Sequence, residues 1–282
     1  MKTIGHLLAG AFCAVATQAM AADEVAMPES PNYGLSGYGE LSYGYGWGSD
    51  NDPENWNFAP INGAIAVNYW LTPTWNLQAE AWFNYFDDLD FGDDYYTSGG
   101  AIHLGWRNSD YYIGGLGSYG SNEDAGSDAY AFAIEAQRYF ENVTLYGQAG
   151  YMSDYDSSFV EAWYVHGVVR YFFDPNLMLE VNAGYTSGDF TGGGVSVDLD
   201  QYKWGAKIEW KPKPDIPVSV FAAYQGNHDN WQPVDYTLTN HTIIAGFKVM
   251  FGQDTLKDMD RHGASLADYN PGFGRFEAWD SY

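Results

Sequence analysis

The sequence predicts an all-β chain that forms a closed antiparallel transmembrane β-barrel of about 12 strands. Aromatic residues make up 18% of the 282 residues, with 24 Tyr and 33 Gly, which suits many short strands better than long amphipathic helices. After the first 21 residues there is no apolar run of about 18 residues, the length that a transmembrane helix needs. Apolar and polar residues instead alternate along most of the chain, as in strands with one apolar face.

The first 21 residues, MKTIGHLLAGAFCAVATQAMA, are typical of a secretory signal peptide. A cationic residue, an apolar run and small residues before the cleavage site occur in order: Lys2, Leu7 to Ala16, Ala19 and Ala21. We expect cleavage near Ala21/Ala22, followed by an N-terminal periplasmic segment over 22–33. The alternatives are a short buried helix and a lipoprotein anchored at Cys13, which the bulky Phe12 disfavours. The mature chain then contains no cysteine.

The barrel domain is expected over residues 34–251. Period-two alternation predicts twelve strands, at 34–47, 59–71, 75–86, 95–107, 110–119, 129–140, 143–152, 159–173, 177–185, 200–210, 218–225 and 240–251. Short turns alternate with wider connections, at 48–58, 87–94, 120–128, 153–158, 186–199 and 226–239. Short periplasmic turns and longer extracellular loops are typical of an outer-membrane barrel.

The register of the hairpins tests this interpretation, because a slip of one residue exchanges the two faces of a strand. Folding the chain about its tight turns pairs apolar residues with apolar residues in five hairpins: Leu71 with Trp75, Trp106 with Tyr111, Phe140 with Val143, Tyr171 with Leu179, and Trp210 with Val218. The pattern favours one continuous sheet.

Aromatic residues cluster near the ends of the expected strands, as in the two interfacial girdles of membrane barrels. Near the short turns these are Trp70, Trp75, Trp106, Tyr111, Tyr139, Tyr171, Trp210 and Phe251. Toward the loops they are Tyr43, Tyr45, Trp47, Tyr85, Tyr119, Tyr130, Tyr151, Trp163, Tyr185, Trp204 and Tyr224. A soluble sandwich with core aromatics at these positions is the alternative.

The polar face of the strands is expected to line the lumen, and it mixes acids, bases and histidines. The candidate pore-lining residues are Glu40, Glu80, Glu135, Glu180, Glu209, Arg107, Arg170, Lys203, Lys207, Lys248, His103 and His166. Buried charges are tolerated mainly when they are paired or hydrated, and we predict an ion pair between Arg170 and Glu180 across their hairpin. Trp82 and Phe86 also face inward in this register, where they could narrow the outer mouth or pack against loops.

The expected loops contain seventeen acidic residues and no Lys or Arg. They are Asp50, Asp52, Glu54, Asp87, Asp88, Asp90, Asp93, Asp94, Glu123, Asp124, Asp128, Asp154, Asp156, Asp189, Asp198, Asp229 and Asp235. Such a rim attracts cations over a screening length of about 8 Å at physiological salt, unless the charge serves only solubility. Divalent cations bridging to lipopolysaccharide phosphates are possible partners.

These loops also contain residues for two more specific sites, a metal site and a hydrolase site. Within DDLDFGDD, Asp88, Asp90 and Asp93 are a candidate metal site, although the spacing fails the EF-hand pattern and no closing Glu follows. His228 and Asp229, with Asp87 and Asp88, are the residue types of an omptin-like surface hydrolase. Basic patches interleaved with aromatic residues are lacking, so no nucleic-acid partner is expected.

The tail over 252–282 contains RHGASL at 261–266 and ends in an aromatic-rich stretch. The signal, the alternating strands and this motif resemble small porin-like outer-membrane barrel proteins of Gram-negative bacteria, of the alphaproteobacterial type. Those proteins usually end near the last strand, so the tail could be a periplasmic extension, a lumen plug through Phe273, Phe276 and Trp279, or a thirteenth strand. The domain prediction treats it as a C-terminal periplasmic tail.

The resemblance and the residue pattern together predict a porin-like outer-membrane channel for passive diffusion of small hydrophilic solutes, with a weak preference for cations. A closed structural or surface-interaction barrel without a pore is the alternative, and an omptin-like hydrolase is a less favoured one. Outer-membrane lipid, lipopolysaccharide and the barrel-assembly machinery are the expected partners. Neither a cofactor nor an enzymatic activity is expected.

Overall fold

The computed structural model describes residues 34–51, 55–90, 94–122, 127–154, 158–192, 195–213, 215–232 and 236–266. The expected signal peptide and the 22–33 segment lie outside these ranges, so their bounds stay predictions. The described residues form β1 (Leu35–Asp50), β2 (Asn55–Trp70), β3 (Trp75–Asp88), β4 (Asp94–Arg107), β5 (Tyr111–Asn122), β6 (Ser127–Tyr139), β7 (Val143–Asp154), β8 (Ser158–Asp174), β9 (Leu177–Gly192), β10 (Val195–Trp210), β11 (Val218–Gln232), β12 (Tyr236–Phe251) and α2 (Leu256–His262).

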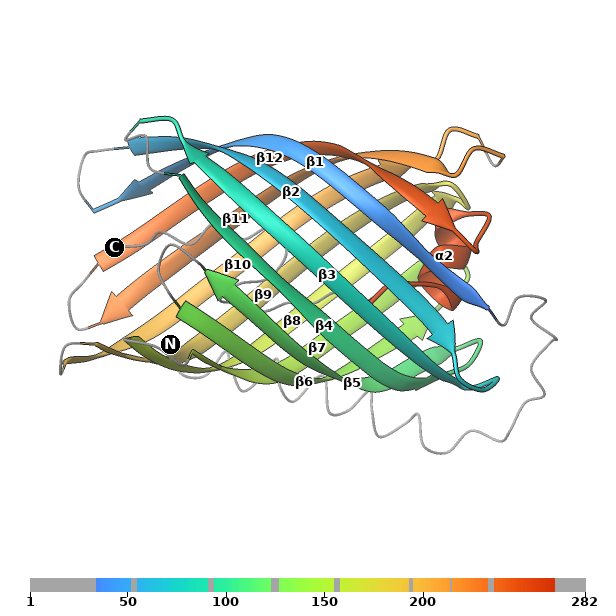
Figure 1. Cartoon of the computed structure of the whole chain (residues 1–282), viewed down its shortest axis with the longest axis horizontal. Helices are drawn as coiled ribbons and strands as arrows, with labels where there is room; N and C mark the ends of the chain where they lie inside the picture. The colour runs from blue at the N-terminus through green and yellow to red at the C-terminus, as the bar shows by residue number, and fades with distance from the viewer. Residues whose placement is uncertain are drawn as a thin grey trace. The chain divides into compact units, whose positions relative to one another are not determined.

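The strands form a closed antiparallel barrel, as the sequence predicts. Each strand pairs with its neighbours in the sequence, and β1 closes the sheet by pairing with β12 from Gly37↔Phe251 to Asp50↔Leu238. Figure 1 shows the tilted strands of the closed sheet, with α2 at the end where β12 finishes. Closure leaves no strand edge unpaired, which is the condition for a sheet to cross a lipid bilayer.

The two faces of the sheet are chemically inverted relative to a water-soluble protein. Large apolar side chains point outward and are exposed, among them Ile134 at 74% and Trp163 at 70%. Inward-facing polar side chains such as Asn76, Gln78 and Asn84 are fully buried. Because successive side chains of a strand point to opposite faces, this distribution follows directly from the alternating sequence. An apolar exterior around a polar interior is the arrangement of a barrel that lipid surrounds.

The register of the hairpins is as predicted in three cases. Tyr171 pairs with Leu179, and backbone hydrogen bonds join Leu71 to Trp75 and Phe140 to Val143. In the other two hairpins the register differs by two residues, so that Trp106 faces Ile113 and Trp210 faces Val220. A shift of two preserves the faces, so the inward and outward sides of these four strands are as predicted.

Two aromatic residues assigned to the girdles face inward instead. Tyr139 is buried in the lumen, and the indole N–H of Trp70 donates a hydrogen bond to the His262 carbonyl oxygen at 2.9 Å. Position near a strand end does not settle which face a side chain occupies; the parity of its position in the strand does.

At one end of the barrel the strands extend beyond the residues whose apolar and polar side chains alternate. β9 reaches Gly192 and β10 starts at Val195, while β11 reaches Gln232 and β12 starts at Tyr236. Most of the expected loops at 186–199 and 226–239 are therefore paired strand. Ladder hydrogen bonds need only backbone groups, so pairing continues where the outward side chains become polar and the alternation ends. We call this end, where β9 and β11 finish, the acidic end; β10 and β12 finish at the turn end.

After β12 the chain turns back toward the lumen and forms α2, which the sequence analysis did not predict. Gly252 makes the turn with φ +77°, a left-handed conformation that glycine adopts without strain. Thr255 caps the helix by accepting a hydrogen bond from the Asp258 backbone N–H at 3.0 Å. We call residues 256–266, which are α2 and the four residues that follow it, the plug. No helix in the described ranges is long and apolar enough to span a membrane.

Replacing Gly252 with alanine tests this turn. An added Cβ would lie 2.4 Å from the Leu35 carbonyl oxygen, in addition to the cost of left-handed backbone. We expect Gly252→Ala to reduce the free energy of unfolding by roughly 1–2 kcal/mol or more, measured by urea titration in lipid vesicles. Gly39→Ala is the matched control, because nothing lies within 4 Å of a Cβ there. Equal stability of the two variants would contradict this account of the turn.

Candidate functional site

All twelve candidate pore-lining residues lie on the inward face of the barrel. Glu40, Glu80, Glu135, Glu209, Arg107, Arg170, Lys248, His103 and His166 are buried, and Glu180, Lys203 and Lys207 are half-buried. Their position does not test whether solutes pass them, so the pore-lining role stays a prediction. The structure divides them into two groups with different surroundings.

The first group lies in the half of the lumen that β2–β7 line, where side chains pack closely. Glu135 is its centre: Tyr112 and Tyr146 hydroxyls donate to its two carboxylate oxygens at 2.8 and 2.9 Å, and His103 Nδ1 lies 3.1 Å from both. His103 Nε2 lies 3.7 Å from Glu80 Oε1. With these groups paired among themselves, the cluster acts as a polar core that holds β3–β7 together across the lumen.

Apolar side chains fill much of the same half. Trp82 packs with Ala101 and Leu116, and Phe86 packs with Trp56 and Phe58. Trp82 and Phe86 are thus inward-facing, as expected. They contact side chains of strands in the barrel, so their packing occurs within the lumen.

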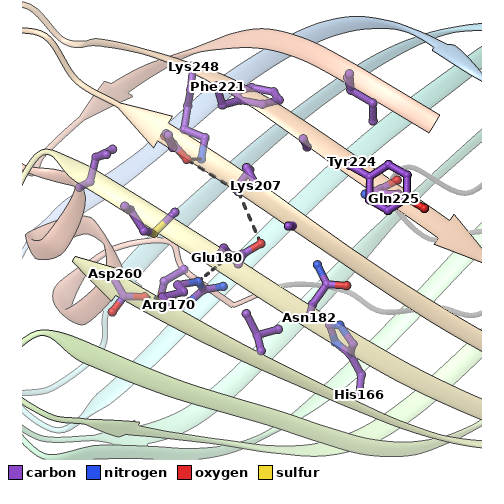
Figure 2. A pocket seen from close by; sticks show the side chains of 18 of the residues that line it. His166, Arg170, Glu180, Asn182, Lys207, Phe221, Tyr224, Gln225, Lys248 and Asp260 are labelled. Atoms are coloured by element: carbon purple, nitrogen blue, oxygen red, sulfur yellow. Dashed lines mark hydrogen bonds and ion pairs between the residues drawn. The ribbon is translucent and has the colours of Figure 1, made fainter. Parts of the chain in front are cut away.

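The second group lines a cavity of about 190 Å³ against β8–β12 and Tyr38 of β1. Lys248 Nζ is 3.1 Å from Glu209 and 3.5 Å from Glu40, and Lys207 Nζ is 3.7 Å from Glu209 and 3.8 Å from Glu180. Figure 2 shows Lys207 and Glu180 on the neighbouring strands β10 and β9, with Lys248 of β12 on the same side of this space. Acids and bases alternate, so that Lys207 and Lys248 each lie within reach of two carboxylates.

Arg170 extends the alternating series of acids and bases to the plug. Its Nε is 2.7 Å from Glu180 Oε2, which confirms the ion pair predicted for this hairpin, and its Nη1 is 2.8 Å from Asp260 Oδ1. Thr144 Oγ1 donates to the other Asp260 oxygen at 2.5 Å. We call the whole series the charge belt: Glu40, Lys248, Glu209, Lys207, Glu180, Arg170 and Asp260.

The rest of the plug is fixed by hydrogen bonds to inward-facing side chains on the opposite side. Gln78 Nε2 donates to the Leu266 carbonyl oxygen at 2.7 Å, and its Oε1 accepts from the Leu266 N–H at 3.1 Å. Arg107 donates to the carbonyl oxygens of Gly263 and Arg261. Apolar contacts add to these: Leu256, Met259 and Ala264 join one buried cluster and Leu266 another.

Basic residues of the plug also bind the turn end. Arg261 donates to the carbonyl oxygens of Phe140 and Glu141, and the Lys257 backbone N–H donates to that of Pro175 at 3.0 Å. Burial of the His262 imidazole lowers its pKa below the ordinary value, so this histidine is neutral at neutral pH.

Because of these contacts with inward-facing side chains, the described part of the tail is a lumen plug, made by 256–266. The expected plug residues Phe273, Phe276 and Trp279 lie outside the described ranges.

Asp260, Gln78 and the tyrosines around Glu135 were not identified from the sequence. The helix itself had a detectable signal, because Thr255 at the N-cap, Asp258 three residues later and Gly263 after the last residue are helix start and stop signals. Contacts of the plug with β3 and β8 had no local signal, since they join residues 90 or more positions apart.

Most of the acidic residues that the structure describes lie on strands rather than in loops. Nine of the seventeen belong to strand ends: Asp50, Asp87, Asp88, Asp94, Asp128, Asp154, Asp189, Asp198 and Asp229. Asp229 is inward-facing and buried, in contrast to the expected loop position. Seven others lie outside the described ranges: Asp52, Glu54, Asp93, Glu123, Asp124, Asp156 and Asp235.

Three exposed carboxylates are neighbours on the outward face at the acidic end. Glu161 of β8 pairs with Asp189 of β9, which pairs with Asp198 of β10. Like charges directly opposite each other destabilise a sheet unless cations or water screen them. This row concentrates negative potential on the outer surface beside β9.

The described residues do not test the candidate metal site, because Asp93 lies outside them, and they separate His228 from Asp229 of the candidate hydrolase site. The Asp90 carboxylate accepts hydrogen bonds from Asn57, and the described residues contain no group of three or more His, Cys, Asp or Glu that could hold a metal ion. Asp93 lies outside the described ranges. His228 and Asp229 are consecutive on β11 and point to opposite faces, and His228 Nδ1 lies 2.8 Å from Thr239 Oγ1.

Comparison with known proteins finds similarity to solved structures only. No protein-family model and no curated protein sequence matches the chain. A KdgM porin in complex with disordered oligogalacturonate has 10% identity and a TM-score of 0.42, over 75% of this chain and 99% of that one. The β domain of the Bordetella autotransporter Brka has 12% identity and a TM-score of 0.49, over 77% of this chain and 100% of that one. The TodX monoaromatic hydrocarbon channel has 7% identity and a TM-score of 0.43, over 79% of this chain and 90% of that one.

The Glu135 cluster predicts a large loss of stability on truncation. Glu135→Ala removes the carboxylate that binds His103, Tyr112 and Tyr146, and leaves these buried polar groups without their partner. We expect the free energy of unfolding in urea to fall by roughly 3–5 kcal/mol. Glu141→Ala, at an exposed turn position, is the control and should change stability by less than about 0.5 kcal/mol. A loss below about 1 kcal/mol for Glu135→Ala would show that the cluster does not hold the barrel together.

Proposed function

We propose that this chain is an outer-membrane channel for passive diffusion of small hydrophilic solutes. The observation that carries the proposal is the unequal filling of the lumen. Packed side chains occupy the half lined by β2–β7, whereas a cavity lies against β8–β12 and is lined by charged and polar groups together with apolar side chains. A solute path would run along the cavity, past Lys203, Lys207 and Lys248.

Buried amides support a hydrated lumen. Both polar side-chain atoms of Gln148 and of Asn240 lack a hydrogen-bond partner in the part of the chain that the structure describes. A buried amide without any partner costs on the order of 1–3 kcal/mol, so water in the lumen is the physical way to satisfy these groups. Gln148 lies on β7 and Asn240 on β12, which places such groups on both sides of the barrel.

The exterior supports placement in the outer membrane of a Gram-negative cell. A continuous apolar outer face needs lipid, and a closed barrel with polar lumen is the strand-built solution for that solvent. The expected signal peptide, cleaved near Ala21/Ala22, would direct the chain out of the cytoplasm. In this orientation the turn end is periplasmic, the acidic end is extracellular, and the barrel-assembly machinery inserts the chain.

A weak preference for cations is proposed from the acidic end. Glu161, Asp189 and Asp198 add to the carboxylates at the strand ends and raise the local concentration of cations at the mouth. The same groups could bind divalent cations that bridge to lipopolysaccharide phosphates. The charge belt contributes little to selectivity, because its acids and bases are paired.

The plug favours a second candidate, a closed structural or surface-interaction barrel. Residues 256–266 lie across the lumen at the turn end and bind side chains of both halves, through Gln78 and Arg170. If the plug stays bound and the lumen carries no solute, the same paired charges are simply the core of a static barrel.

Planar-bilayer conductance of the purified mature protein separates the two candidates. We expect discrete channels whose reversal potential in a KCl gradient indicates cation preference. Ala223→Trp places a large ring in the cavity, and should reduce the conductance of single channels by about half or more, on the scale of the volume a buried aromatic fills. Ala222→Trp is the matched control, since its side chain is exposed on the outward face of the same strand.

The outcomes are distinct. Equal conductance of the two tryptophan variants would show that ions do not pass along the β8–β12 half. Silence of the native chain, and also of a variant whose plug is unlocked as described below, would favour the closed barrel.

A further inference from the structure

We propose that the plug, residues 256–266, is a gate that closes the turn end of the barrel and leaves the lumen while the barrel itself stays intact. This inference rests on the proposed channel function. It assigns a regulatory role to a segment that follows the last strand.

The barrel closes without any contribution from the plug. The β1–β12 ladder joins fourteen residue pairs, from Gly37↔Phe251 to Asp50↔Leu238, and its last residue precedes the plug. No plug residue belongs to a strand of the sheet, so releasing the plug breaks no interstrand hydrogen bond. Movement of the plug is thus separable from unfolding of the barrel.

The plug forms one end of the cavity. Six of its residues line that space: Leu256, Met259, Asp260, Ala264, Ser265 and Leu266. Figure 2 shows Asp260 beside Arg170 at the edge of the cavity, with Glu180 on the next strand. A solute moving along β8–β12 toward the turn end would therefore meet the plug.

Departure of the plug leaves the charges of the barrel balanced. Within the charge belt, the barrel supplies three acids, Glu40, Glu180 and Glu209, and three bases, Arg170, Lys207 and Lys248. Asp260 is the fourth acid, and it comes from the plug. Removing one partner of a buried pair is strongly unfavourable only when the other is left unpaired. Arg170 keeps Glu180 at 2.7 Å, so the bound and released states both satisfy it.

The remaining polar contacts are ones that water can replace. Gln78 and Arg107 bind backbone groups of the plug, and those groups find water when the segment leaves. Four buried apolar side chains, Leu256, Met259, Ala264 and Leu266, lose burial. Their burial favours the bound state by roughly 1.5–3 kcal/mol for each large side chain, while the polar contacts fix the position of the plug.

A pair of cysteines can lock and unlock this gate. Thr144 and Asp260 are in side-chain contact, and the only cysteine of the sequence, Cys13, lies in the expected signal peptide. In Thr144→Cys/Asp260→Cys, oxidation ties the plug to β7. Reduction leaves the plug without its bonds to Arg170 and Thr144, since Asp260 is gone. Without these charge-assisted hydrogen bonds the plug binds the barrel less tightly. We therefore expect reduced protein to carry about tenfold more current per inserted barrel than oxidised protein.

A second comparison needs no disulfide. Asp260→Ala should raise the current per barrel relative to the native chain, by about tenfold on the same argument. Asp254→Ala removes an equal charge from an exposed position just before the plug and should leave the current unchanged. Retention of the folded form during electrophoresis without boiling would verify in each case that the barrel is intact.

Failure of the gate and failure of the channel give different results. If oxidised, reduced and native proteins all conduct equally, the channel stands and the gate is wrong. If every folded variant is silent, including the reduced double cysteine variant and Asp260→Ala, the proposed channel function fails and the gate fails with it. Reversible current on reduction, together with the difference between the Asp260 and Asp254 variants, supports both.

Discussion

Lipid offers no hydrogen bonds to a polypeptide, and the rest of this structure depends on that constraint. Every backbone group of a strand in the bilayer must find its partner inside the protein, so the sheet has to close through β1 and β12. Closure creates an interior, and the pleat then divides the side chains of each strand into an outward apolar set and an inward polar set. The lumen is thus a consequence of satisfying the backbone, and its chemistry is that of the alternate residues.

An interior made from polar alternate residues has to be satisfied in turn, and the two halves of this lumen do so differently. Around Glu135, protein groups satisfy one another at short range, and aromatic rings fill the surrounding space. Tyr112 fits there because glycines face it: a Cβ at Gly105 would lie 2.3 Å from its ring. Against β8–β12 the charges form a looser series with separations of up to 3.8 Å beside a cavity. The first arrangement rigidifies the barrel, and the second leaves room for water.

The plug uses the same inward face as a docking surface. Gln78 on β3 and Arg170 on β8 belong to opposite sides of the barrel, and the plug joins them through Leu266 and Asp260. Because Arg170 also binds Glu180, it keeps an acidic partner when the plug leaves, whereas the hydrogen bonds of buried Arg107 to Gly263 and Arg261 pass to water. The plug can therefore be added or removed without leaving Arg170 unpaired.

The sequence by itself determined the barrel: alternation specified twelve strands and their faces, parity placed all twelve candidate lumen residues inward, and a tight turn at Pro175 specified the Arg170–Glu180 pair. Each of these is a local property, read within one strand or one hairpin. The sequence could not predict where β9–β12 begin and end at the acidic end, because backbone pairing continues after the alternation of apolar and polar side chains stops. Only the tertiary structure decided that Asp260 binds Arg170, that Glu135 gathers His103, Tyr112 and Tyr146, and that half of the lumen is filled. Those contacts depend on the closure of the barrel. Closure brings together residues that are not connected by any periodicity in the sequence.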